Sequence, residues 1–202
     1  MTPYEQFCYD LKKCNEVDLD DFISVNILNP IPKVFKGSSK NYLAFRERIA
    51  KKFNVDPNHI FLVGSSSMGF SYHKSGKLFD SDSDIDVAIV DEALFEEYSE
   101  ILSTYHYDII YHRVPQTRSQ QTRYNTFLGY YAVGWLRPDK GTDIMNRHPR
   151  VNDWWEYFKS ISYNRSEIGD HKVSAGIYKS KKYLLKYQRL NLINLRKSII
   201  TS

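Results

Sequence analysis

Apolar residues recur along the chain with two different periods, and these periods predict both helices and short strands. Within residues 38–53, apolar positions follow one another at steps of 3, 4 and 4, the spacing of one helix face. These positions are Tyr42, Phe45, Ile49 and Phe53. Residues 60–63 and 85–90 are instead short apolar runs that stop at Gly64 and Asp91. Such bounded runs are typical of buried strands.

The remaining segments complete an alternation of helices and strands. Helices are expected at 4–27, 38–53, 91–105, 154–161 and from 180 onward, the fourth capped by Asn152. Strands are expected at 60–63, 85–90, 107–114, 132–136 and 173–178. This order predicts an α+β or α/β fold, in which a small mixed sheet is flanked by helices and the N- and C-terminal segments are helical.

The composition narrows the class of protein. The chain has 202 residues, enough for one domain, and its 42% hydrophobic and 26% charged residues are ordinary for a soluble globular protein. No stretch approaches the roughly 20 apolar residues that a membrane span needs, and residues 1–10 lack the apolar run of a signal peptide. Cys8 and Cys14 alone cannot form a disulfide framework or a zinc knuckle. We therefore expect a cytoplasmic protein with no membrane partner.

Charge is distributed unevenly along the sequence. The net charge is +4, yet residues 171–202 contain eight Lys or Arg and no Asp or Glu. The first 170 residues therefore hold 20 basic against 24 acidic residues. We expect a core over residues 1–170 and a basic strand and helix over 171–202 that pack on it. Such asymmetry indicates either contact with a polyanion or a solvated helix face, and charge alone does not separate the two.

A turn rich in glycine and serine, residues 64–69, directly follows the first predicted strand. If a helix begins at Ser65, its free backbone N–H groups and positive dipole end form an anion site beyond the strand. Gly64 allows the backbone to approach a phosphate, and the Ser65 hydroxyl can donate to a phosphate oxygen.

Asp84 and Asp86 lie two residues apart on the second predicted strand, so both carboxylates project from one face. Carboxylates held so close repel each other, and protonation or a divalent cation relieves the repulsion. A calcium-binding EF-hand loop that starts at Asp80 is excluded, because it would need glycine where Ile85 stands. A metal site is therefore the favoured interpretation of Asp84 and Asp86.

These two features together resemble the signature of the nucleotidyltransferases of the DNA polymerase β superfamily. The matching residues are Gly64-Ser65 and Ser83-Asp84-Ile85-Asp86-Val87, within residues 60–90. The resemblance implies transfer of a nucleoside monophosphate from a nucleoside triphosphate to a hydroxyl. It implies that Gly64, Ser65 and Ser66 bind the nucleotide and that Asp84 and Asp86 hold two Mg²⁺ ions, which Mn²⁺ can replace.

The resemblance also implies a third carboxylate on a later strand. Asp139 is the first choice, because it follows the predicted strand at 132–136. Asp108 is the rival, because it lies in the predicted strand at 107–114. The sequence does not decide between them.

The basic residues near the C-terminus fall on one face of the predicted helix. They are Lys179, Lys182, Lys186 and Arg189, at steps of 3, 4 and 3. With the interleaved tyrosines they suit a triphosphate or a short single strand, through charge and stacking, and we predict that Lys179 and Lys182 contact the nucleotide. An amphipathic helix that closes the domain explains the pattern equally well.

The overall pattern also resembles the Hailong-type nucleotidyltransferases of bacterial antiphage defence, which are thought to build short DNA oligomers primed on a C-terminal tyrosine. This resemblance implies Tyr178, Tyr183 or Tyr187 as the priming residue, a short single-stranded product and a co-encoded effector protein. Two alternatives stay open. One is an antitoxin-type enzyme that adenylylates a partner toxin. The other is an inactive nucleotide- or nucleic-acid-binding module, expected if no further acidic group lies within metal reach of Asp84 and Asp86.

Overall fold

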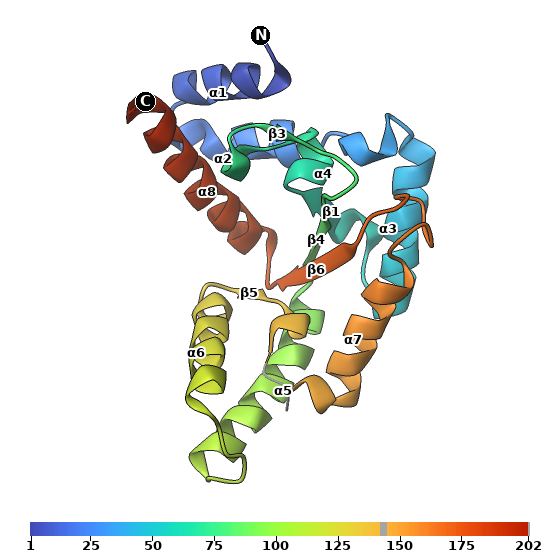
Figure 1. The fold of residues 1–202 in the computed structure, drawn as a ribbon, viewed down its shortest axis with the longest axis vertical. Helices are drawn as coiled ribbons and strands as arrows, with labels where there is room; N and C mark the ends of the chain where they lie inside the picture. Colours follow the sequence, from blue (N-terminus) through green and yellow to red (C-terminus); the bar gives the residue numbers. More distant parts are fainter. Residues whose placement is uncertain (142–144, 202) are drawn as a thin grey trace.

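A four-stranded mixed sheet forms the centre of the fold, with strands in the order β1–β4–β6–β5 (Figure 1). These strands are β1 (Ile60–Val63), β4 (Ile85–Val90), β6 (Val173–Tyr178) and β5 (Trp135–Leu136). β4 runs antiparallel to β1 and parallel to β6, while β5 runs antiparallel to β6. The computed structural model describes residues 1–141 and 145–201. Over that part of the chain, the predicted α+β class with a small mixed sheet is confirmed.

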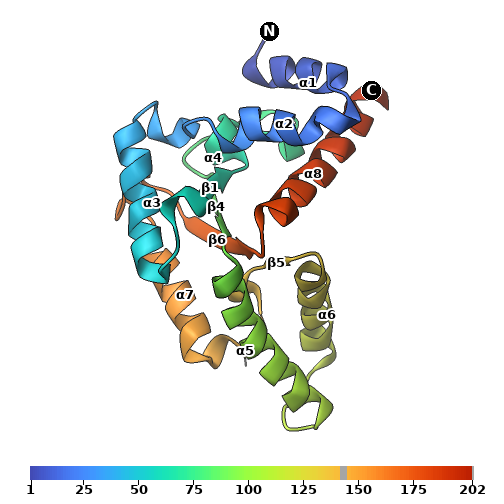
Figure 2. The same cartoon turned by 180° about the vertical axis from the view of Figure 1, so that it is seen from behind.

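Helices cover both faces of this sheet (Figures 1 and 2). They are α1 (Pro3–Lys13), α2 (Leu19–Ile23), α3 (Ser39–Phe53), α4 (Ser65–Met68), α5 (Glu92–Ile110), α6 (Arg118–Ala132), α7 (Pro149–Ser160) and α8 (Lys181–Thr201). A short hairpin of β2 (Phe70–Ser71) and β3 (Lys77–Leu78) lies between α4 and β4 in the sequence.

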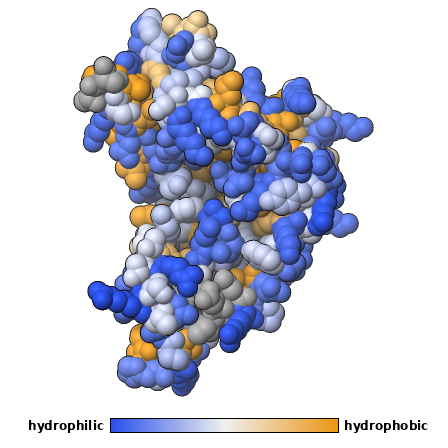
Figure 3. All heavy atoms as spheres, in the orientation of Figure 1, coloured by the Kyte–Doolittle hydropathy of each residue, from blue (hydrophilic) through white to orange (hydrophobic). Residues whose placement is uncertain are grey.

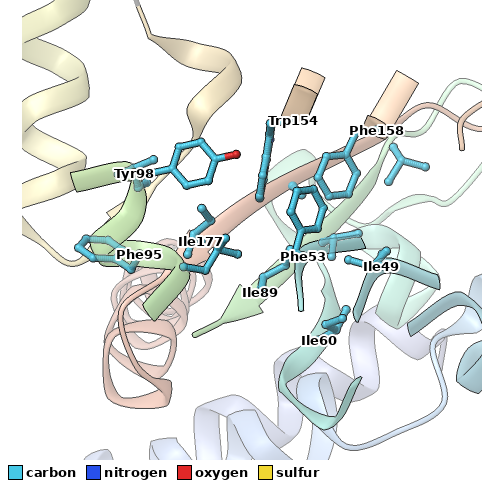
Figure 4. Packing of buried hydrophobic residues seen from close by; sticks show 14 of the residues in the cluster. Ile49, Phe53, Ile60, Ile89, Phe95, Tyr98, Trp154, Phe158 and Ile177 are labelled. Atoms are coloured by element: carbon cyan, nitrogen blue, oxygen red, sulfur yellow. The ribbon is translucent and has the colours of Figure 1, made fainter. Parts of the chain in front are cut away.

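One face of the sheet is covered by α3, α5, α6 and α7, and it holds the larger apolar core. α3 begins after Ser38, whose side chain accepts a hydrogen bond from the Asn41 N–H, and its predicted apolar face is buried. Figure 4 shows aromatic side chains of α3 and α7 gathered beside the strands, with Phe53 next to Trp154 and Ile89 below them. Side chains of a strand point alternately to the two faces of the sheet, and the isoleucines of β4 therefore enter this core.

The opposite face of the sheet is covered by α1, α2, α4 and α8. Ala88 and Val90 of β4 contribute to this second core, together with Leu184 and Leu192 of α8. Every residue of β6 is buried, and this strand lies between β4 and β5. The basic C-terminal segment thus supplies an interior strand of the sheet, while a domain boundary at residue 170 stays a prediction.

Three local predictions are wrong. α5 continues to Ile110, so residues 107–110 are helical where a strand was expected, because Tyr105 and Ile109 still pack on the larger core at helical spacing. α7 begins at Pro149 after His148, not after Asn152, since proline is favoured at the first helical position. The strand expected at 132–136 is reduced to two residues, because α6 extends to Ala132.

Within residues 1–141 and 145–201, none of the helices combines the length and apolar character that crossing a bilayer requires. The face seen in Figure 3 is mostly hydrophilic, with apolar atoms scattered in small groups.

Candidate functional site

The turn after β1 and the start of β4 lie directly against each other. Val63 pairs with Asp86 in the β1–β4 register, and Gly64 follows with φ +68° and ψ −149°. Only glycine adopts this backbone conformation without strain. A Cβ atom added at Gly64 would lie 3.4 Å from Oδ2 of Asp86. The glycine turn and the Asp86 carboxylate are therefore neighbours in the fold.

A cavity of about 200 Å³ lies beside them, lined in part by residues of β4, β6 and α8. Its lining includes Gly64, Asp86, Arg137, Ser174, Tyr187 and Gln188. The cavity therefore combines a glycine turn, a carboxylate, a guanidinium and aromatic side chains on rigid elements. This combination suits a ligand with an anionic part and a flat, apolar part.

Asp86 supplies a carboxylate to the lining of this cavity. The Asp86 side chain is exposed to solvent and lines the cavity, while surrounding protein atoms partly desolvate its carboxyl. This desolvation raises the pKa of the Asp86 carboxyl, and the charge of Asp84 adds to the rise, while Ser174 and Arg137 oppose it. The Ser174 hydroxyl donates to Oδ1 of Asp86 over 3.0 Å. Asp84 is exposed and immediately precedes β4.

The strand beside β4 carries a serine, not a carboxylate, opposite Asp86. β6 pairs with β4 so that Ser174 lies opposite Asp86. Asp139 instead forms a two-point ion pair with Arg137, with N–O distances of 3.1 and 2.7 Å. Burial disfavours the charge of Arg137, yet Asp139, Asp86 and Asp84 together keep its pKa above the ordinary value. Asp139 thus pairs with Arg137, whose positive charge in turn lowers the pKa of Asp86.

Asp108 lies in a different part of the molecule. It belongs to the last turn of α5, pairs with Arg113 over 3.2 Å and lines a separate cavity with Arg150. Within residues 1–141 and 145–201, no three Asp, Glu, His or Cys side chains gather in a group that could hold a metal ion. The described residues therefore bring Asp84 and Asp86 together without a third acidic partner.

The serines after Gly64 have unequal roles. Ser66 is fully buried, and its hydroxyl donates to the Val63 carbonyl over 3.1 Å. The Ser67 hydroxyl donates to the carbonyl of Ile27 over 2.8 Å. The backbone thus engages both hydroxyls, which leaves the Ser65 hydroxyl, at the start of α4, as the one suited to a ligand.

The predicted contacts of Lys179 and Lys182 with a nucleotide find no support in their positions. Lys179 turns toward α5, where its Nζ lies 2.5 Å from Glu96 and 3.9 Å from Glu92. Lys182 is exposed and lies outside the cavity lining. Further along α8, Arg189 pairs with Asp20 of α2 over 3.0 Å. These pairs favour the interpretation of α8 as a helix that closes the domain.

The three tyrosines proposed as priming residues differ in position. Tyr178 and Tyr187 line the cavity, and burial raises the pKa of both hydroxyls. Tyr178 is only 3% exposed, whereas Tyr187 is partly accessible. Tyr183 lies outside the lining and covers Gly134, where an added Cβ would meet its ring at 2.4 Å.

Sequence reasoning missed an aromatic and amide wall of the cavity. Trp135 lines the cavity, and its ring centroid lies 5.0 Å from that of Tyr187. Gln188 is 2% exposed and accepts a hydrogen bond from the Tyr72 hydroxyl over 3.1 Å. The sequence does contain one signal for the buried Gln188. This glutamine lies four residues from Leu184 and four from Leu192, and therefore on the apolar face of α8.

Comparison with known proteins adds no relative. No family model matches the chain, and neither a curated protein nor a solved structure matches it. Function must therefore be argued from the site itself.

Proposed function

We propose that the cavity beside Asp86 binds the magnesium complex of a nucleoside triphosphate, and that the protein transfers the nucleoside monophosphate to a hydroxyl, which loses its proton as pyrophosphate leaves. The single observation that carries the proposal is the position of Gly64 against Asp86, with 3.4 Å between a Cβ built on Gly64 and Oδ2 of Asp86. A glycine turn that admits phosphates next to a carboxylate that binds a cation is the pairing that triphosphate chemistry requires.

The chemistry of Asp84 and Asp86 fits one magnesium ion. Carboxylate oxygens are hard ligands, and magnesium commonly takes one or two of them together with phosphate oxygens and water. When bound, magnesium neutralises phosphate charge during transfer. Arg137 adds a fixed positive charge at the same cavity, held by Asp139. The aromatic wall of Trp135 and Tyr187 gives the base a surface for stacking.

Two forms of this transfer differ in which hydroxyl accepts the nucleoside monophosphate. Tyr187 lines the cavity and is partly accessible, so we propose it as an acceptor in the chain itself, which would prime an oligonucleotide. Modification of a toxin or another partner protein would instead bring a hydroxyl from outside. A Tyr187→Phe variant distinguishes the two, because labelling of the chain is lost while labelling of a partner persists.

Binding without transfer is a second candidate, and Ser174 favours it. A neutral hydroxyl opposite Asp86 leaves a second metal ion without its third anionic ligand among the described residues. The site then holds a nucleotide as a regulatory or sensing ligand.

One set of variants tests both candidates. The wild-type chain is incubated with Mg²⁺ and each common ribo- and deoxynucleoside triphosphate, labelled at the α-phosphate, and triphosphate binding is measured by calorimetry. Incorporation that disappears in Asp86→Asn supports transfer. Binding without incorporation, together with gained incorporation in Ser174→Asp, supports the binding module. Absence of triphosphate binding by the folded wild-type chain contradicts both.

A further inference from the structure

A second cavity, of about 690 Å³, lies between α3, β1 and the start of α8, where the rear view in Figure 2 shows α3 and α8 on opposite sides of β1. Lys40 and Arg46 of α3 and Lys181 of α8 line it, and no described Asp or Glu does. Within residues 1–141 and 145–201, none of these three cations belongs to an ion pair. The cavity is therefore a concentration of uncompensated positive charge.

Arg46 provides an independent sign of a missing partner. Its Nε is the one buried side-chain nitrogen or oxygen without a hydrogen-bond partner in the described part of the chain. The guanidinium carbon lies 4.5 Å from the centroid of the Tyr42 ring, which fixes the head of the side chain at the cavity. A buried donor without an acceptor is unfavourable, so a rearrangement that brings the Arg46 guanidinium onto an anionic ligand is favoured.

The N-termini of two helices add to the positive potential in this second cavity. α3 begins at Ser39 and α8 at Lys181, both residues line the cavity, and neither helix has an acidic residue in its first turn. The positive ends of both helix dipoles therefore reinforce the three side-chain cations.

We infer that this second cavity binds single-stranded nucleic acid through its phosphates. The cations come from two separate helices around an open concavity, so they match several phosphates along a strand better than one small anion. Phe61 and Leu43, the latter 44% exposed, provide apolar surface for bases between the charges. No residue lines both cavities, so this site stands independently of the proposed triphosphate site.

Salt-dependent binding of a short fluorescent oligothymidylate, followed by anisotropy, tests the inference. Each phosphate contact on a single strand contributes about −0.7 to the slope of log K against log salt concentration. The double variant Lys40→Ala/Lys181→Ala should make that slope shallower by about 1.4, and Arg46→Gln by about 0.7. Lys12→Ala/Lys51→Ala is the matched control, because both lysines are exposed and lie outside the cavity. Its slope should equal that of the wild type.

Several results would overturn this assignment. They are an unchanged slope in the cavity double variant, an equal loss in the control, and competition by inorganic phosphate, a mononucleotide or polyglutamate as strong as by the oligonucleotide. Arg46→Gln alone could disturb folding, but the two exposed lysines carry the test without it. Mg²⁺–ATP binding measured by calorimetry should be the same in the Lys40→Ala/Lys181→Ala variant and the wild type. This comparison separates failure of the proposed nucleic-acid site in the second cavity from failure of the proposed triphosphate site.

Discussion

The two faces of the central sheet are built from the same strands but differ in what their side chains contact. On one face, Ile85, Val87 and Ile89 of β4 enter a continuous apolar core. On the other face, Asp86 alternates with Ala88 and Val90, and a cavity lies beside the carboxylate. Close packing stabilises the first face, while the second leaves space next to a charged group. We therefore propose that the second face, which packs on an apolar core of its own as well, is the one that binds a ligand.

The largest effect is expected from damage to the packed face. Ile89 is fully buried, so Ile89→Ala should lower the free energy of unfolding by about 2–5 kcal/mol, measured by urea denaturation. Leu78 is 66% exposed, and Leu78→Ala should change the same quantity by less than about 0.5 kcal/mol. Equal effects of the two substitutions would break the distinction between the packed face and the surface.

A smaller effect is expected at the glycine turn, and it should reach ligand binding. Gly64→Ala forces a side chain into a conformation with φ +68°, at a cost of about 1–3 kcal/mol, and places a methyl group against Asp86. Gly37 also has a positive φ, +84°, but nothing lies within 4 Å of an added Cβ. Calorimetry with Mg²⁺–ATP should therefore show weaker binding for Gly64→Ala and wild-type binding for Gly37→Ala. Equal affinities would remove the turn from the site.

The smallest effect concerns the pH dependence of Asp86. Its folded pKa is raised above the ordinary value of 3.8, chiefly by burial, so the folded state holds this proton more tightly than the unfolded state. This carboxyl therefore makes the folded chain less stable as pH rises from the unfolded pKa through the folded pKa. Asp86→Asn should remove that contribution and raise the melting temperature of the ligand-free protein at neutral pH.

Binding should respond to pH in the opposite direction, because magnesium requires the ionised carboxylate. Mg²⁺–ATP affinity of the wild type should fall as pH decreases through the raised pKa of Asp86. A lower melting temperature for Asp86→Asn than for the wild type, in thermal unfolding without ligand, would show that Asp86 stabilises the fold instead of serving a ligand.

The elements with strong local periodicity could be predicted from the sequence. α3 follows from apolar positions that repeat at the helix period, whereas β1, β4 and β6 follow from short runs of mostly apolar residues. The extent of α5 could not be predicted, since its C-terminal half packs on residues of another helix, such as Tyr124 of α6.

The site was predictable only where its residues are close in sequence. Gly64 and Asp86 come together because β1 and β4 are adjacent antiparallel strands. Ser174 opposite Asp86 depends on which strand pairs with β4, and Gln188 depends on how α8 crosses the sheet. The ion pair of Lys179 with Glu96 likewise depends on how β6 and α5 pack, which the sequence around Lys179 does not reveal. Pairing across long separations is a tertiary property that local patterns do not contain.

A structure determined with a non-hydrolysable nucleoside triphosphate and Mg²⁺ tests the central claim most directly. The account predicts that the triphosphate lies against Gly64 and Ser65, with magnesium between its phosphates and the carboxylates of Asp84 and Asp86, and with the base beside the aromatic wall. A triphosphate bound only at the second cavity, around Lys40 and Lys181, or magnesium held away from Asp86, would contradict it.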